Sequence, residues 1–216
     1  MSIQEIAIRK ELSLGQQQPY QTNAIKQIKI GIWIYLILLL FEGALRKWFL
    51  PSLATPLLVV RDPVAIGIIF LAIYHRLVYW NIYLIITLLI GLFSLSLSLL
   101  VGHGNIYVSL YGLRPILLHF PFAFVIASVF DRTDVEKVGK FLLWLTPFMT
   151  FLIALQFYSP QSAWVNRGIG GDIAGAGFSG AMGYFRPPGT FSFTNGNTLF
   201  YSLVTCFVFY FWLVKS

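Results

Sequence analysis

An arginine-led motif near the end of the chain combines several groups that suit phosphate binding. It runs from Arg186 to Phe191 with the sequence Arg-Pro-Pro-Gly-Thr-Phe, and Asn195 follows it. A guanidinium group can bind phosphate through a bidentate, charge-assisted pair. The two prolines restrict the backbone, Gly189 allows a ligand to approach it closely, and Thr190 and Asn195 add hydrogen-bonding groups. The motif therefore predicts a binding site for an anionic ligand.

Three further arginines, Arg46, Arg61 and Arg114, stand at the predicted outer ends of long apolar segments. A charged group at the edge of a membrane bundle is a candidate for function. Together with the motif arginine, these side chains could converge on one outward cavity and bind phosphate there. The alternative is local, because Asp62 can cap the helix after Arg61 and a lone arginine at a helix end often extends to the membrane interface.

Candidates for proton transfer are few. Asp172, Glu42 and His103 lie on the predicted outer side, where any of them could act as a general base. Their spacing does not select one of the three. His119, inside an apolar segment, is expected to be a hydrogen-bonded structural residue rather than a base. No second histidine or acid stands at metal-site spacing, so neither a metal nor another cofactor is expected.

The elements that position these residues are predicted to be membrane-spanning helices. Hydrophobic residues make up 57% of the 216 positions and charged residues 11%, a balance typical of a polytopic membrane protein and not of a soluble domain. A helical span needs about 20 mostly apolar residues. The predicted fold class is therefore an all-α transmembrane helix bundle. Its six spans are expected at about 30–49, 57–74, 81–101, 113–130, 140–158 and 194–213.

The polar ends and connections predict the orientation of the bundle. Residues 1–29 are polar and are expected to form a cytoplasmic tail, either frayed or a short interfacial helix, while 30–216 form the bundle. With the N-terminus inside, nine of the 15 lysines and arginines are cytoplasmic and six lie outside, in line with the positive-inside rule. The glycine-rich segment 159–193 is then an outer loop, acting as a lid or as a flexible linker. Its Gly175–Gly180 part matches G-x-G-x-x-G, but it lies between spans instead of between a strand and a helix, so no nucleotide cofactor is expected.

Two motifs in this order resemble the N-terminal half of the O-antigen polymerase/ligase family. The first is Tyr-Gly-Leu-Arg-Pro at the predicted opening of the fourth span (111–115), and the second is the Arg186 motif with its following asparagine. The resemblance implies glycan transfer from an undecaprenyl-diphosphate carrier at the outer face of the bacterial inner membrane, without a metal. By position, Arg114 and Arg186 are the best matches, and Thr190 and Asn195 come next. The other two outer arginines rest on the physical argument alone.

The resemblance also sets expectations about partners and completeness. Members of that family usually have more spans and a large outer loop in their second half. The chain is therefore expected to be an N-terminal fragment, a split gene product or a reduced relative, with a missing C-terminal half or other assembly proteins as partners. Enzymatic activity as a membrane glycosyltransferase is one hypothesis, and a non-enzymatic subunit or small transporter for an anionic ligand is the other. The net charge of +7 is attributed to membrane orientation and anionic lipids, so no nucleic-acid partner is expected.

Overall fold

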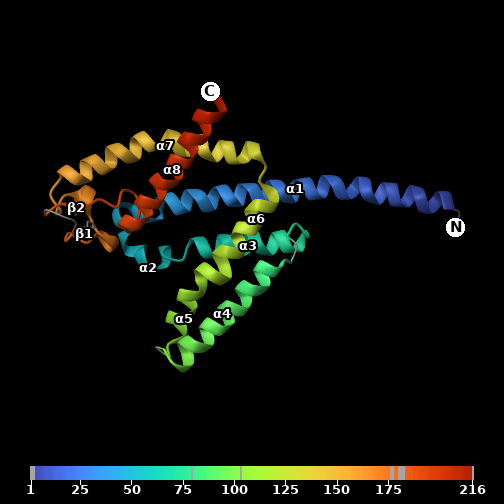
Figure 1. Ribbon diagram of the computed structural model, residues 1–216, viewed down its shortest axis with the longest axis horizontal. Helices are drawn as coiled ribbons and strands as arrows, with labels where there is room; N and C mark the ends of the chain where they lie inside the picture. The colour runs from blue at the N-terminus through green and yellow to red at the C-terminus, as the bar shows by residue number, and fades with distance from the viewer. Residues whose placement is uncertain (1–2, 79, 103, 176–177, 180–182, 216) are drawn as a thin grey trace. The chain divides into compact units, whose positions relative to one another are not determined.

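The protein is an almost entirely helical membrane protein. The computed structural model describes residues 3–78, 80–102, 104–175, 178–179 and 183–215, and it is 79% helical with almost no strand (Figure 1). The predicted all-α helix bundle is therefore confirmed. Within these described residues, six segments are long and apolar enough to cross a membrane, judged by length and composition. They are Thr22–Phe49, Pro51–Tyr74, Ile82–Leu100, Ile106–Val129, Arg132–Tyr158 and Thr194–Val214.

These segments are built from eight α-helices joined in places by shorter π or 3-10 turns. The α-helices are α1 (Ile3–Ala44), α2 (Ala54–Leu57), α3 (Arg61–Tyr74), α4 (Ile82–Leu100), α5 (Ile106–Arg114), α6 (Phe120–Val129), α7 (Arg132–Tyr158) and α8 (Thr194–Lys215). The π turns are η1 (Leu45–Phe49) and η3 (Pro115–His119), and the 3-10 turns are η2 (Pro51–Leu53), η4 (Trp164–Asn166) and η5 (Ile169–Gly171). One antiparallel pair of two-residue strands, β1 (Phe178–Ser179) and β2 (Phe185–Arg186), lies between α7 and α8.

The described chain forms two compact units. Unit 1 contains Met1–Tyr35 and Asp62–Phe130. Its core comes from three helices, α1, α3 and α6, each contributing one residue every three or four positions, as one face of a helix requires. These core residues are Ile28, Ile32, Tyr35, Ala65, Ile68, Ala72, Phe122, Val125 and Val129. The small residues Ala65 and Ala72 permit the close helix approach that is typical of membrane packing.

Unit 2 contains Leu36–Arg61 and Asp131–Ser216. Its apolar core joins the end of α1 to α7 and α8, and its buried members are Leu40, Leu142, Leu145, Met149, Phe200 and Val204. Gly139 sits where the Phe207 ring packs against α7, because a Cβ atom at this glycine would collide with that ring. Because Gly139 has no side chain, α8 can approach α7 closely at this position.

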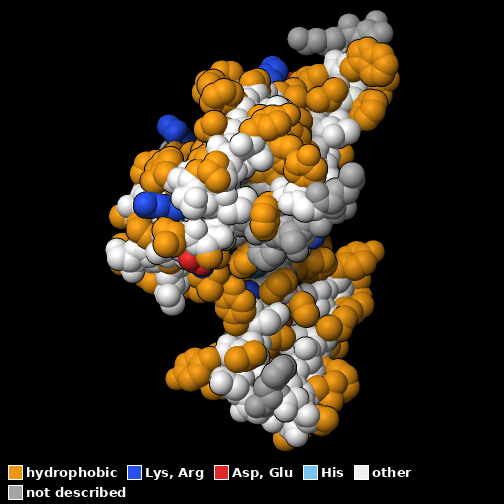
Figure 2. All heavy atoms as spheres, turned by 90° about the vertical axis from the view of Figure 1, so that its left-hand side faces the viewer, with side chains coloured by type: hydrophobic (Ala, Val, Ile, Leu, Met, Phe, Trp, Pro, Cys, Tyr) orange, Lys and Arg blue, Asp and Glu red, His pale blue; other side chains and the backbone are white. Residues whose placement is uncertain are grey.

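Large apolar side chains also cover much of the surface. Phe70, Phe93 and Phe151 are among the exposed hydrophobic residues, and each belongs to a spanning segment. Figure 2 shows one face on which hydrophobic side chains dominate and charged ones are sparse. Such a surface suits contact with lipid chains, and the protein is accordingly a multi-pass membrane protein.

Several helices extend beyond the predicted span limits. α1 begins at Ile3, so the described part of the expected tail is helical, and α7 begins at Arg132, well before the expected start near 140. The cap of α7 is Asp131, paired with Asp134 in a capping box. Capping side chains satisfy the first backbone N–H groups of a helix, so its polar opening turns need no apolar residues.

Candidate functional site

The π turn η1 directs two successive cations into unit 2. A π turn holds an extra residue, which changes the direction of the side chains that follow. The turn is closed by the Leu50 N–H donating to the Leu45 carbonyl at 2.6 Å. Arg46 and Lys47, both buried, lie on this turn, and Lys47 is 0% exposed.

Lys47 binds the backbone of the Arg186 motif. Its Nζ donates to the carbonyl oxygens of Gly189 at 2.7 Å and Phe191 at 2.9 Å. Gln156 of α7 holds the same glycine from another side, since its Oε1 accepts from the Gly189 N–H at 2.8 Å and its Nε2 donates to the Gly189 carbonyl at 3.2 Å. We call residues 187–192 the anchored loop, because two buried side chains fix its backbone.

Thr190 fastens the anchored loop to α1. Its hydroxyl donates to the Leu40 carbonyl at 2.6 Å, and the residue is buried. Gly43 makes this contact fit, because a Cβ atom there would collide with the loop backbone at Thr190, Phe191 and Ser192. The predicted ligand group Thr190 is thus engaged inside the protein.

Arg186 and Asn195 lie together on the surface next to the anchored loop. With Phe193 and Thr194 they line an open hollow of about 310 Å³, which we call the Arg186 hollow. Arg186 is exposed on β2, and Asn195 is exposed in the first turn of α8. The N-terminal end of a helix carries a partial positive charge, so an anion is favoured at this end of α8.

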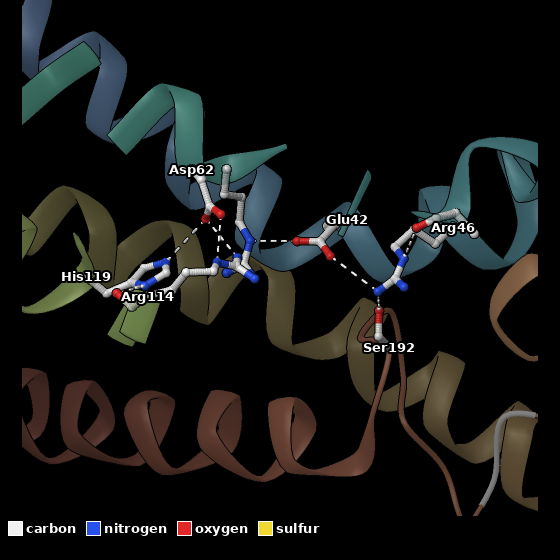
Figure 3. A network of polar contacts seen from close by, with 8 residues as sticks. Glu42, Arg46, Asp62, Arg114, His119 and Ser192 are labelled. Atoms are coloured by element: carbon white, nitrogen blue, oxygen red, sulfur yellow. Dashed lines mark hydrogen bonds and ion pairs between the residues drawn. The ribbon is translucent and has the colours of Figure 1, made fainter. Parts of the chain in front are cut away.

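Arg46 and Arg61 share one carboxylate in unit 2. The Arg61 Nε donates to Glu42 Oε2 at 2.6 Å, and the Arg46 Nη1 lies 3.5 Å from Glu42 Oε1 (Figure 3). Arg46 also donates to the Ala54 carbonyl at 2.8 Å and to the Ser192 hydroxyl at 2.9 Å. Glu42, a candidate general base, is therefore a buried ion-pair partner.

Arg114 is paired in unit 1. Its Nη2 donates to Asp62 Oδ1 at 2.8 Å, and its Nε lies 2.6 Å from Asp62 Oδ2 (Figure 3). His119 Nε2 lies 3.9 Å from the same carboxylate, and His119 Nδ1 is 3.1 Å from the Arg114 carbonyl oxygen. Asp62 thus binds Arg114, and was expected to cap a helix. Arg114 lies inside the segment Ile106–Val129, about 12 Å from its start at 1.5 Å per residue, and was expected at the opening of that span.

The convergence of four arginines on one cavity stays a prediction. Arg46, Arg61 and Arg186 belong to unit 2, and Arg114 belongs to unit 1. Within unit 2, Arg46 donates a hydrogen bond to Ser192 at one end of the anchored loop, and Arg186 directly precedes the loop's first residue.

The two other candidate bases differ in what the structure describes. Asp172 is exposed in the segment between α7 and α8, and its Oδ1 accepts from the Ala174 N–H at 2.9 Å. His103 lies outside the described residues, as do parts of the glycine-rich motif at 176–177 and 180. In the part of the chain that is described, no three histidine, cysteine, aspartate or glutamate side chains are grouped so that they could hold a metal ion.

Sequence analysis missed three residues that build this region: Lys47, Gln156 and Asn166. All three are almost fully buried. The Asn166 Nδ2 donates to the Gln156 carbonyl at 2.9 Å and so ties the outer segment to the end of α7. A signal was present for Gln156 because a polar side chain inside an apolar span is costly unless it is paired.

The comparisons with known proteins add no relative. No family model, characterised protein or solved structure matches the chain. The likeness to O-antigen polymerases and ligases therefore rests on the two motifs alone. What can be stated directly is a multi-pass membrane protein whose Arg186 motif is fixed by buried contacts.

Proposed function

We propose that this chain is a bacterial inner-membrane protein of surface-polysaccharide assembly that binds the diphosphate of an undecaprenyl-diphosphate-linked glycan. The observation that carries the proposal is the Arg186 hollow, where an exposed guanidinium, the Asn195 amide and the start of α8 meet. These are groups that recognise phosphate oxygens. In the proposed topology the N-terminus is cytoplasmic and the hollow faces outward.

The anchored loop supports this proposal because it limits the movement of Arg186. Lys47 and Gln156 fix Gly189, and the Asn197 Nδ2 donates to the Pro187 carbonyl at 3.2 Å, next to Arg186 itself. Binding groups held in place before the ligand arrives lose little conformational entropy on binding. The backbone that follows Arg186 is thus held in place before a ligand binds.

The charge of unit 2 also favours an anion. Two arginines, Arg46 and Arg61, pair with the same carboxylate, that of Glu42, and Lys47 is buried in the same unit. Arg46 binds Ser192, and the next residue lines the Arg186 hollow. Charges act over longer distances in a protein interior than in water.

In the proposed reaction, the diphosphate is the leaving group. An acceptor hydroxyl attacks the anomeric carbon of the glycan, the bond from that carbon to the diphosphate oxygen breaks, and the hydroxyl proton passes to a base. Arg186 stabilises the charge that develops on the departing diphosphate. Asp172, exposed in the same outer segment, is the proposed base, and a further half of the enzyme or a partner completes the site.

Binding of the carrier lipid tests the proposal. Purified protein in detergent is titrated with undecaprenyl diphosphate, and bound lipid is counted by native mass spectrometry. Arg186→Ala is expected to weaken binding at least about tenfold and Arg186→Lys by less, because lysine keeps the charge but lacks the planar fork. Arg76→Ala, which removes an exposed arginine of unit 1, is the matched control and should bind like the wild type.

Two results would contradict the proposal. Equal binding by Arg186→Ala and the wild type would remove this residue from the site. Binding of inorganic pyrophosphate with the same Arg186 dependence, but without any binding of the carrier lipid, would favour the alternative of a membrane subunit or small transporter for an anionic ligand.

A further inference from the structure

A second open groove lies between α7 and α8 in unit 2. Its volume is about 520 Å³, and we call it the α7–α8 groove. Its lining residues are Arg132, Val135, Glu136, Leu203, Cys206, Phe207 and Tyr210. The distance along α8 from Asn195 to Tyr210 is about 22 Å at 1.5 Å per residue, so this groove is separate from the Arg186 hollow.

The groove has apolar walls inside the membrane-spanning segments. Val135 comes from α7, and Leu203 and Phe207 come from α8. Gly139 lets the Phe207 ring pack directly on α7, and Figure 1 shows the two helices crossing. An open apolar groove between two spans offers a surface that suits a lipid chain and not water.

One end of the groove is polar and holds a positioned arginine. The Arg132 Nε donates to Glu136 Oε1 at 3.1 Å and to the Tyr210 hydroxyl at 3.0 Å. Tyr210 in turn donates to Glu136 Oε1 at 2.7 Å. These contacts use only the Nε of Arg132, whose side chain is 72% exposed. Among the described residues, no side chain accepts a hydrogen bond from its two Nη groups.

The carboxylates near Arg132 are already engaged. Asp131 and Asp134 form the capping box of α7, and Lys137 lies 3.5 Å from Asp134 Oδ1. Glu136 accepts from both Arg132 and Tyr210. Arg132 is the first residue of a segment that is long and apolar enough to cross a membrane, and lipid phosphates lie near the ends of such segments.

We propose that the α7–α8 groove binds one phospholipid with an anionic head group. An acyl chain lies along Leu203 and Phe207, and the phosphate accepts hydrogen bonds from the two Nη groups of Arg132. Charge argues for an anionic head group, because a zwitterionic lipid would bring a positively charged ammonium group next to Arg132 and Lys137. The volume lies within the range of roughly 300–1,000 Å³ of ordinary ligand sites. This site does not depend on the proposed glycan function.

Lipid titration tests the head-group contact. Delipidated full-length protein in detergent is titrated with dioleoylphosphatidylglycerol or dioleoylphosphatidylcholine, and bound lipid is measured by native mass spectrometry. We expect one phosphatidylglycerol, bound at least about tenfold more tightly than phosphatidylcholine, which is the lower range for a charge-assisted contact. Arg132→Gln should abolish this preference. Lys26→Gln, which removes an exposed lysine of unit 1, should leave it unchanged.

The single cysteine of the chain gives the location of the bound lipid. Cys206 lines the groove and is the only cysteine in the sequence, so alkylation with N-ethylmaleimide places a bulky group in the groove alone. Alkylated wild type is expected to lose binding of both lipids, while Cys206→Ala treated in the same way should keep it. Lipid binding that survives alkylation, an absent preference for phosphatidylglycerol, or an equal effect of Lys26→Gln would each overturn the proposal.

Discussion

Replacing Lys47 by methionine should loosen the anchored loop. Methionine has a similar length and shape to the lysine stem, but it cannot donate to the two carbonyl oxygens that Lys47 binds. Gly189 keeps a second donor in Gln156, whereas Phe191 has no other donor to its carbonyl among the described contacts. The loss therefore falls mainly on the second half of the loop.

The size of the effect follows from these contacts. A hydrogen bond to a charged group contributes about 1.5–3 kcal/mol, so two such bonds contribute about 3–6 kcal/mol before other terms. Replacing lysine returns part of this free energy, because the variant no longer has to desolvate a buried ammonium group. We expect a net reduction of about 2 kcal/mol in the free energy of local opening, which corresponds to roughly 30-fold faster exchange of the loop amides.

Hydrogen exchange measured by mass spectrometry on peptides covering 187–193 checks this expectation. Lys137→Met is the matched control, because Lys137 is exposed and its ion pair with Asp134, at 3.5 Å, contributes little energy. Wild-type exchange in the loop of Lys47→Met would refute the anchoring role of Lys47. Faster exchange across the whole protein, and not only in the loop, would show that the substitution destabilises the fold in general.

Two more substitutions test the packing of each unit. Gly43→Ala should lower the melting temperature, because the added Cβ collides with the loop backbone at 190–192. The control is Gly67→Ala, whose Cβ meets open space and should leave the melting temperature unchanged or slightly raised. Equal melting temperatures for the two variants would contradict the close approach at Gly43. Asp62→Asn should lower the free energy of unfolding by about 3–5 kcal/mol, because it leaves the half-buried Arg114 charge without its carboxylate. Adding Arg114→Gln to this variant should recover part of the loss. Additive effects of the two substitutions in a double-mutant cycle would argue against their coupling.

The spans could be predicted from the sequence because a run of about 20 apolar residues is a strong local signal. The opening turns of α7 could not be found in this way, since Arg132 to Lys140 is rich in charge. Those turns are stabilised by the Asp131 cap and by the Arg132–Glu136 pair at i,i+4 spacing, neither of which adds to hydropathy.

The anchored loop could not be predicted because its contacts join distant parts of the chain. Lys47 lies 142 positions from Gly189, and Thr190 lies 150 positions from Leu40. A single sequence gives the residue types that can pair, but it does not give the tertiary approach that brings them together. For this reason Thr190 was expected to face a ligand, whereas its hydroxyl is buried against α1.

The pairing of arginines sharpens the interpretation of the site. Charge inside a membrane bundle is stable when a carboxylate lies close by, and Glu42 stands four positions before Arg46, on the same face of the helix. Asp62 provides the same compensation for Arg114. These two pairs account for arginines whose position in the sequence alone suggested ligand binding. The case for a phosphate ligand therefore depends on Arg186 and its hollow, and a carrier-lipid titration of Arg186→Ala decides it.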